Sequence, residues 1–236
     1  MSPGGLHSNG AIECVLFDLD GTLVDTAPDM VAVLLDLQLA HRLEPVPYEL
    51  ARSQVSNGAI GLIRLAFPEA SEAEVTDLHG DYLARYERSV CVRSSVFPGL
   101  GDLLTALERV GCPWGVVTNK PQRMTEPLLA GLGLAERAAC IVSGDTLPQR
   151  KPDPSPLLLA SRLAGVLPGR SVYVGDAARD IEAGRAAGMA TVAALYGYVT
   201  ADDDPAAWRA DQMAADTEEL AHILLKAVNL DAGCQP

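Results

Sequence analysis

Short apolar runs recur along the chain, and each is followed by a longer segment in which apolar residues return every three or four positions. A run of four to six apolar residues is typical of a strand buried on both faces of a parallel sheet, where neither face needs polar side chains. The runs that predict such strands are Ile12–Phe17, Trp114–Val117, Ala139–Val142, Ser171–Val174 and Ala190–Ala194.

Amphipathic segments separate these runs, and each would cover the sheet with its apolar face. They lie near Gly101–Val110, Thr125–Leu132, Pro156–Ala164 and Asp180–Ala187, and a closing helix is expected at Thr217–Val228 after a short extended segment at Gln212–Ala215. Strand alternating with helix predicts an α/β fold, in which a Rossmann-like parallel sheet carries helices on both faces.

The alternation is interrupted once. From Thr26 to Val96 the sequence contains no convincing strand and only helical patterns, at Met30–Ala40, Ile60–Phe67 and Ala73–Arg88. We therefore expect an α-helical domain, residues 26–96, inserted into a core domain formed by residues 12–25 and 97–236. Residues 1–11 are rich in Gly, Ser and Asn and are expected to be a flexible tail.

Charge and cysteine content limit the classes of partner. The chain has 236 residues and a formal net charge of −13, which disfavours the basic face that a nucleic-acid backbone requires. No apolar run reaches the length of a membrane span, and the first residues lack the pattern of a signal peptide. The five cysteines are widely spaced without a CxxC pair, which fits a reducing compartment. We expect a cytoplasmic protein, a monomer or weak homodimer, without nucleic-acid or membrane partners.

Polar residues stand where several of the expected strands end. The first strand ends in FDLDGT, the second in VVTN and the fourth in VGDAARD, and RKPDP follows the third. In an open parallel sheet, ligands bind outside the carboxyl ends of the strands, so these four segments would meet at one edge. Each string alone is a weak or moderate signal, since Asp and Gly are common in turns. All four in this order, each after a strand, make a chance match remote.

This ordered set resembles the motifs of the haloacid dehalogenase-like hydrolase superfamily, in the branch with a helical cap inserted after the first strand. The resemblance implies that Asp18 is a nucleophile, because a carboxylate that attacks phosphorus divides one hard displacement into two easier steps. Asp20 lies two residues further on, so its side chain points to the same side and can act as general acid and then as base. Gly21 permits the sharp turn of the backbone after this point.

A divalent cation is implied as well, because one anion that attacks another needs positive charge nearby. Asp18, Asp176 and the main-chain carbonyl of Asp20 offer the oxygen ligands that Mg²⁺ prefers. Asp180, one helical turn beyond Asp176, is expected to be a further ligand or to support the others. Lys151, one of only three lysines, is expected to neutralise the transferring phosphoryl group and to fix Asp18.

Two further residues are implied to hold the phosphate oxygens: Thr118 through its hydroxyl and Asn119 through its backbone N–H. One position departs from the pattern of the resembling phosphatases, because Ala177 stands where a polar residue often follows the fourth-strand aspartate. Alanine offers no side-chain ligand or hydrogen bond. The surroundings of the metal are therefore expected to depend more on Asp180 and on water.

The cap is expected to select the substrate by closing over it. The segment SNGAIG begins at Ser56 and opens a helix, so the N–H groups around Asn57 and Gly58 can meet an anionic or hydroxylated substrate. A plain helix start has the same sequence pattern. Arg64 on that helix, together with Arg52, is a candidate substrate anchor, and no role is assigned to the histidines.

Several reactions share these motifs within the superfamily. Asp20 disfavours dehalogenation, since a halide needs no acid, and the absence of lysine between residues 26 and 96 excludes Schiff-base cleavage of phosphonates. The overall resemblance favours phosphomonoester hydrolysis, while a mutase of the β-phosphoglucomutase kind uses the same motifs and stays open. A non-catalytic phosphate-binding module predicts the loss of a catalytic residue, and none is lost. A phospho-receiver domain lacks the helical insert.

Other strings resemble the phosphoglycolate phosphatase branch in particular, which includes enzymes that act on N-acetylmuramic acid 6-phosphate. They are WGVVTNKP, LGLAER, and GYV followed by Pro, Trp208 and Ala210-Asp211. They indicate kinship and carry no chemistry of their own. The resemblance thus implies a Mg²⁺-dependent phosphatase for a small phosphorylated metabolite, with phosphoglycolate and N-acetylmuramic acid 6-phosphate both open.

Overall fold

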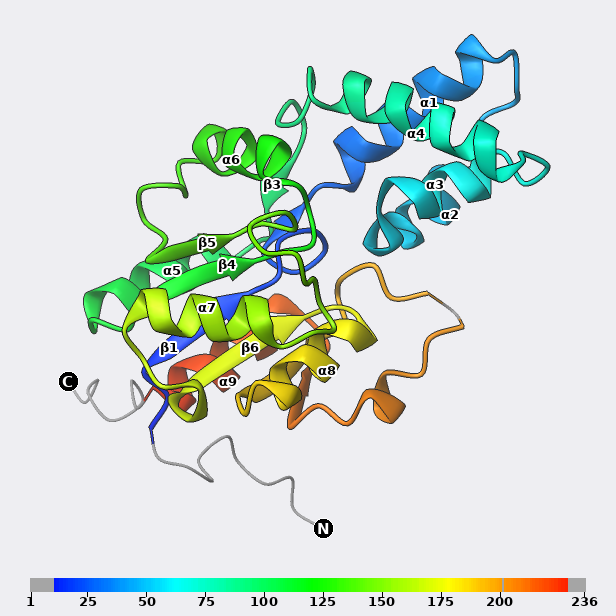
Figure 1. The fold of residues 1–236 in the computed structure, drawn as a ribbon. Helices are drawn as coiled ribbons and strands as arrows, with labels where there is room; N and C mark the ends of the chain where they lie inside the picture. Colours follow the sequence, from blue (N-terminus) through cyan, green and yellow to red (C-terminus); the bar gives the residue numbers. More distant parts are fainter. Residues whose placement is uncertain (1–10, 201, 229–236) are drawn as a thin grey trace.

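The computed structural model describes residues 11–200 and 202–228, so nearly all of the expected tail lies outside the described residues. Six strands form one parallel sheet in the order β5-β4-β1-β6-β7-β8 (Figure 1). Their bounds are Cys14–Phe17 (β1), Trp114–Val117 (β4), Cys140–Val142 (β5), Ser171–Gly175 (β6), Ala190–Ala194 (β7) and Gln212–Ala214 (β8). The predicted parallel sheet is confirmed, and the strand ends differ from the prediction by at most two residues.

Helices cover both faces of this sheet, as predicted, with α7 and α8 on one face and α5 and α9 on the other (Figure 1). The helices of this part are α5 (Leu100–Arg109), α6 (Gln122–Gly131), α7 (Ser155–Ala164), α8 (Ala178–Ala186) and α9 (Thr217–Ala227), with short 3₁₀ turns at Pro168–Arg170 and Pro205–Trp208. None of the helices among residues 11–200 and 202–228 is long and apolar enough to span a membrane.

The alternation of side chains along β1 explains why the sheet needs helices on both faces. Cys14 and Leu16 belong to the apolar cluster beneath α7 and α8, whereas Val15 and Phe17 belong to the cluster beneath α5 and α9. All four side chains are fully buried. Burial of a side chain of the size of Leu or Phe contributes about 1.5–3 kcal/mol, so the central strand is held firmly from both sides.

Four helices follow the first strand and pack against one another: α1 (Ala27–Ala40), α2 (Tyr48–Ser53), α3 (Gly58–Ala66) and α4 (Glu72–Tyr86). We refer to α1–α4 as the helical insert. A 3₁₀ turn at Val55–Asn57 leads into α3. Ser71 and Glu74 form a capping box that starts α4, and the hydroxyl of Tyr82 on α4 donates to the carbonyl of Met30 on α1 (2.8 Å). In Figure 1 the insert lies beside the sheet.

A short antiparallel pair connects the insert to the sheet. It consists of β2 (Val24–Asp25) and β3 (Ser95–Val96), which pair Val24 with Val96. The expectation of no strand between Thr26 and Val96 was wrong at this point, because two residues are too few to produce a recognisable alternation. The domain limits expected from the sequence, residues 26–96 for the helical part, stay a prediction.

Candidate active site

The order of the strands brings the sequence motifs to one place. After β1 the chain adds β4 and β5 on one side of it and β6, β7 and β8 on the other, so β1 is the point where the direction of strand addition reverses. Open α/β sheets bind ligands at such a point, outside the carboxyl ends of the strands. Asp18 follows β1, Thr118 follows β4 and Asp176 follows β6, so their side chains meet there.

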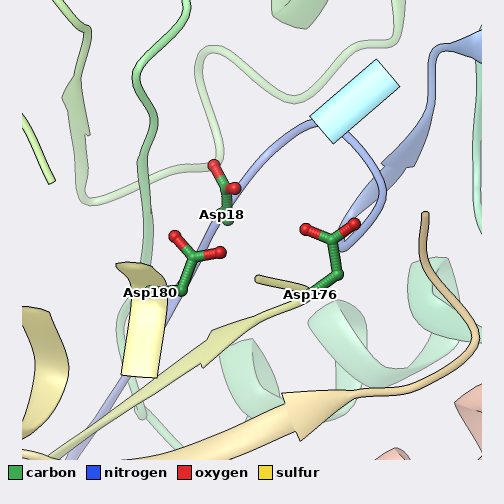
Figure 2. Close-up of side chains that lie close together, drawn as sticks. All are labelled: Asp18, Asp176 and Asp180. Atoms are coloured by element: carbon green, nitrogen blue, oxygen red, sulfur yellow. The ribbon is translucent and has the colours of Figure 1, made fainter. Parts of the chain in front are cut away.

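Three of the predicted residues form a buried cluster of carboxylates: Asp18, Asp176 and Asp180 (Figure 2). Each offers one oxygen, and these oxygens lie within 4.8 Å of one another. Burial, followed by the charges of Asp180 and Asp18, raises the pKa of Asp176 to about 7. Burial also raises the pKa of Asp18, against the opposing charge of Lys151. The protein surroundings alone therefore disfavour the fully ionised form of this cluster.

One carboxylate oxygen of Asp176 has hydrogen-bond partners, and the other has none among the described residues. Its Oδ2 accepts hydrogen bonds from the Tyr198 N–H (2.9 Å) and the Ser56 hydroxyl (2.7 Å). Its Oδ1 is buried and has no hydrogen-bond partner among the described residues. An unpaired buried carboxylate oxygen is costly unless a cation meets it. An all-oxygen, anionic donor set of this kind suits a hard divalent cation such as Mg²⁺, so the residues fit the expected metal.

Lys151 lies against two of these carboxylates, as expected from the sequence. Its Nζ is 2.9 Å from Asp18 Oδ1 and 2.8 Å from Asp180 Oδ1, and it donates to the Tyr173 hydroxyl (2.8 Å). Burial acts to lower the pKa of Lys151, but the charges of Asp18 and Asp180 outweigh it and the pKa is raised. The ammonium group therefore stays charged beside the predicted nucleophile.

Asn119 positions Lys151 through a reciprocal pair of hydrogen bonds. Its side-chain amide donates to the Lys151 carbonyl (3.0 Å), and the Lys151 N–H donates back to its Oδ1 (3.0 Å). The Thr118 hydroxyl oxygen accepts from the N–H of Lys120 (3.1 Å). Ala177 contributes its backbone N–H to Asp180 Oδ2 (3.1 Å), so Asp180 receives support at the position where the side chain supplies none.

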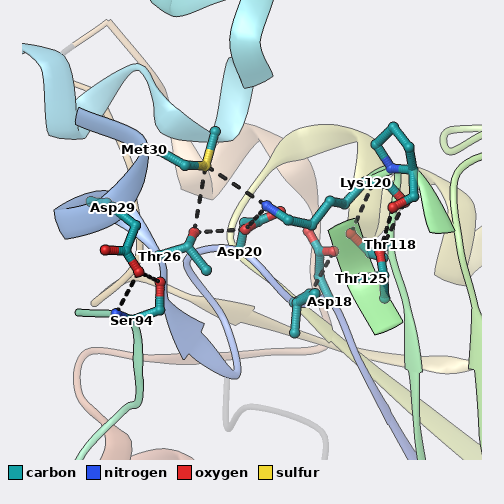
Figure 3. A network of polar contacts seen from close by, with 12 residues as sticks. Asp18, Asp20, Thr26, Asp29, Met30, Ser94, Thr118, Lys120 and Thr125 are labelled. Carbon is teal, nitrogen blue, oxygen red and sulfur yellow. Dashed lines mark hydrogen bonds and ion pairs between the residues drawn. The ribbon is translucent and has the colours of Figure 1, made fainter. Parts of the chain in front are cut away.

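Asp20 lies beside Thr26, next to the start of the helical insert (Figure 3). Its Oδ1 accepts from the Thr26 hydroxyl (2.6 Å) and lies 2.9 Å from Lys120 Nζ. Sequence reasoning missed Lys120 as a site residue. Two signals were present, since it is one of three lysines and stands within WGVVTNKP.

Gly21 sits where the chain leaves Asp20. Its φ of +81° lies in the left-handed region, and a Cβ there would collide with the Asp176 carboxylate and with Tyr198. Glycine is thus required both by the turn and by the close approach.

A cavity of about 510 Å³ lies between the strand ends and the helical insert. Asp18, Asp20, Thr118 and Asn119 line it together with Asn57 and Gly58, so the structure brings these predicted residues together. Arg64 does not line it. The Arg64 side chain is exposed and bonds Glu72 at 3.0 Å, so the structure does not bring this expected anchor to the cavity. His79, to which the sequence assigned no role, does line the cavity.

The insert also touches the carboxylate cluster directly. In addition to the bond from Ser56 to Asp176, the guanidinium of Arg179 on α8 donates to the Ser56 carbonyl (2.6 Å). Arg52, the second candidate anchor, lies over the ring of Tyr198, 4.9 Å from its centroid. Neither Ser56 nor Arg179 was singled out as a cluster contact from the sequence, because their partners lie more than 100 positions away along the chain.

The chain belongs to the haloacid dehalogenase-like hydrolase family, whose model matches residues 12–188. It is 44% identical over 218 residues to an N-acetylmuramic acid 6-phosphate phosphatase from Pseudomonas aeruginosa, covering 92% of this chain and 96% of the relative. It is also 44% identical to a phosphoglycolate phosphatase from Xylella fastidiosa, covering 93% of this chain and 94% of the relative. A solved structure described as a predicted phosphoglycolate phosphatase from Haemophilus somnus matches with a TM-score of 0.79 and 29% identity, covering 90% of this chain and 97% of that one.

These matches confirm the family and the fold that the sequence motifs implied. The relatives that align over nearly their whole length carry the names of phosphatases, so the prediction of a phosphatase of this family is confirmed at that level. N-acetylmuramic acid 6-phosphate and phosphoglycolate are the substrates given in the names of these relatives.

Proposed function

We propose that this chain is a Mg²⁺-dependent phosphomonoesterase that hydrolyses a small phosphorylated metabolite, phosphoglycolate or N-acetylmuramic acid 6-phosphate, through a phospho-aspartate on Asp18. One observation carries the proposal. Asp18 lines the cavity, with the Lys151 ammonium at 2.9 Å and with Asp176 and Asp180 close by. This is the charge arrangement that nucleophilic attack on a phosphate dianion requires.

In the first step, an Asp18 carboxylate oxygen bonds to phosphorus while the bond from phosphorus to the ester oxygen breaks. Asp20 gives a proton to the departing oxygen. Both hydrogen bonds to the Asp18 carboxylate, from Lys151 and from the Leu19 N–H (2.7 Å), fall on Oδ1. They fix the orientation of the carboxylate, and Lys151 offsets negative charge that builds up on the phosphoryl group.

In the second step, water attacks phosphorus and Asp20, now ionised, takes its proton. The bond between Asp18 and phosphorus breaks, which releases inorganic phosphate and restores both aspartates. A divalent cation held by Asp18, Asp176 and Asp180 would supply further positive charge at the phosphoryl oxygens. Thr118 and Asn119 line the cavity as well and would orient the phosphate.

The proposal is tested by Mg²⁺-dependent hydrolysis of p-nitrophenyl phosphate. We expect Asp18→Asn to reduce kcat at least about a thousandfold, as the loss of a nucleophile typically does, and we expect excess EDTA to abolish wild-type turnover. Asp102→Asn, which changes an exposed aspartate on α5, serves as the matched control and should keep full activity. Near-normal turnover by Asp18→Asn would exclude the covalent route.

The substrate is assigned by comparing kcat/KM for phosphoglycolate, N-acetylmuramic acid 6-phosphate and hexose phosphates. The mutase alternative is separated in the same screen, because a β-phosphoglucomutase-like enzyme would isomerise β-glucose 1-phosphate with little release of inorganic phosphate. A non-catalytic phosphate-binding module would bind phosphate and turn over none of these compounds.

A further inference from the structure

Lys120 is a buried cation in the cavity wall that does not contact the carboxylate cluster. Its side chain is 4% exposed and approaches one carboxylate, that of Asp20. The other cations in or near the wall differ from it. Lys151 contacts Asp18 and Asp180, the Arg179 guanidinium is bound to the Ser56 carbonyl, and Arg150 is exposed.

The remaining contacts of Lys120 are weak acceptors. Its Nζ lies 3.9 Å from the sulfur of Met30 on α1 and 4.5 Å from the ring centroid of Tyr86 on α4. Figure 3 shows the ammonium between Asp20 and Met30, where the insert faces the strand ends. A lysine ammonium has three N–H donors, and a thioether or a ring face satisfies a donor poorly. Lys120 is therefore a desolvated cation with capacity for a second anionic partner.

We propose that Lys120 binds a carboxylate of the substrate, so that the preferred substrates are phosphomonoesters that also carry a carboxylic acid. The inference rests on the proposed function and narrows its substrate class. Lys151 and a divalent cation held by the carboxylate cluster would serve the phosphate group, so a second anionic group needs a cation of its own. Lys120, which contacts Asp20, supplies it.

The position of Lys120 also limits where that carboxylate stands. Its Nζ is 2.9 Å from Asp20 Oδ1, and Asp20 is the proposed proton donor to the ester oxygen. A carboxylate bonded one carbon away from that oxygen therefore lies within reach of Lys120. A carboxylate carried on a more distant part of a sugar reaches Lys120 only if the sugar folds back across the cavity. The geometry thus favours a carboxylate one carbon away from the ester oxygen. The experiment below distinguishes this position from a carboxylate on a distant part of a sugar.

Two matched substrate pairs isolate the carboxylate. Phosphoglycolate is compared with 2-hydroxyethyl phosphate, and N-acetylmuramic acid 6-phosphate is compared with N-acetylglucosamine 6-phosphate. Within each pair, the ratio of kcat/KM for the acid to that for its neutral partner measures preference for the carboxylate. Any loss of acid–base efficiency through Asp20 affects both members of a pair and cancels from the ratio.

We expect Lys120→Gln to lower this ratio by about 10- to 100-fold, the range given by loss of a hydrogen bond to a charged group. The pair in which the ratio falls identifies the source of the carboxylate. Lys120→Arg, which keeps the charge, should retain most of the ratio and serves if Lys120→Gln does not fold. Lys226→Gln removes the same charge from an exposed position on α9 and should leave both ratios unchanged.

Ratios that stay the same in Lys120→Gln for both pairs would overturn the inference, while the phosphatase proposal stands if the wild type still hydrolyses the acids. A wild type that hydrolyses p-nitrophenyl phosphate but neither acid would instead overturn the proposed substrates. A wild type that hydrolyses no phosphate ester with metal present would remove the proposed function itself.

Discussion

At the scale of single residues, Asp176 is a buried carboxylate whose hydrogen bonds within the protein satisfy only part of it. One oxygen of its carboxylate is fully bonded by Tyr198 and Ser56, and the other is buried without a partner among the described residues. Since Asp18 and Asp180 lie within 4.8 Å, three carboxylates repel one another in a region of low dielectric. We therefore expect a divalent cation bound by this cluster to stabilise the fold.

Asp176→Asn removes one of these charges and keeps the shape of the side chain. We expect the metal-free variant to melt at or above the wild-type temperature. A saturating excess of Mg²⁺ should raise the wild-type Tm by about 5–10 °C, from roughly 2.7 kcal/mol of binding free energy at a hundred times Kd. The variant should lose most of this shift, and Asp102→Asn should keep it. Equal Mg²⁺ shifts in wild type and Asp176→Asn, measured by calorimetry, would contradict the assignment.

At the scale of elements, Asp29 ties the start of the helical insert to its end. It is 2% exposed in the first turn of α1, and its carboxylate accepts from the N–H groups of Val92 (3.0 Å), Arg93 (2.9 Å) and Ser94 (2.8 Å) and from the Ser94 hydroxyl (2.7 Å). These residues lead directly into β3. One side chain thus links the first helix of the insert to the segment that returns to the sheet, next to the β2–β3 pair.

Asp29→Ala leaves the N–H groups of residues 92–94 without this acceptor. We expect the variant to lose about 3 kcal/mol of unfolding free energy, because hydrogen bonds to a charged group each contribute roughly 1.5–3 kcal/mol and part of the backbone regains water. The loss is measured by urea unfolding followed by circular dichroism. Asp36→Ala, at an exposed position of the same helix, should change stability by less than about 0.5 kcal/mol. A similar loss of unfolding free energy in both variants would show that the hydrogen bonds of Asp29 do not stabilise the fold in particular.

The elements that sequence reasoning found are those with a long or continuous pattern. β1, β4 and β6 are apolar on both faces and were located to within two residues, and the motifs at their ends met as the sheet rules require. α2 and β3 were missed, since six and two residues are too short to show a period.

The same limit applies to the site. Asp18, Asp176, Asp180 and Lys151 could be predicted because each belongs to a motif that follows a strand the pattern had already located. The contact of Lys120 with Asp20 joins residues 100 positions apart, across the interface between insert and sheet, and no local pattern encodes it. The exposed pair of Arg64 with Glu72 likewise depends on how α3 and α4 pack.

At the scale of the whole molecule, the two apolar clusters on either side of the sheet also contain thiols. Cys14 and Cys140 lie in the cluster beneath α7 and α8, and Cys112 lies in the other. All three are free and buried, so they pack as small apolar residues. Burial raises the pKa of the Cys14 thiol to about 12, and those of Cys112 and Cys140 to about 11.

These thiols make the fold sensitive to alkali, and the sign follows from the direction of the shift. Above pH 9 the thiols of the unfolded chain lose their protons while those of the folded chain keep them, so the free energy of unfolding falls as pH rises. Each thiol contributes a slope of up to about 1.4 kcal/mol per pH unit. Urea unfolding between pH 8 and pH 10 should therefore show a falling stability.

Cys14→Ala and Cys140→Ala distinguish this cause from the titration of other groups. Each variant loses stability at every pH because of the cavity it creates, and each should show a shallower fall between pH 9 and pH 10 because one titrating group has been removed. The slope is the informative quantity, since a cavity shifts the whole curve without changing its dependence on pH. If both variants kept the wild-type slope, the alkaline loss would have to come from other groups that titrate in this range, such as the buried tyrosines Tyr82, Tyr86 and Tyr173, whose phenol pKa burial raises well above its usual value.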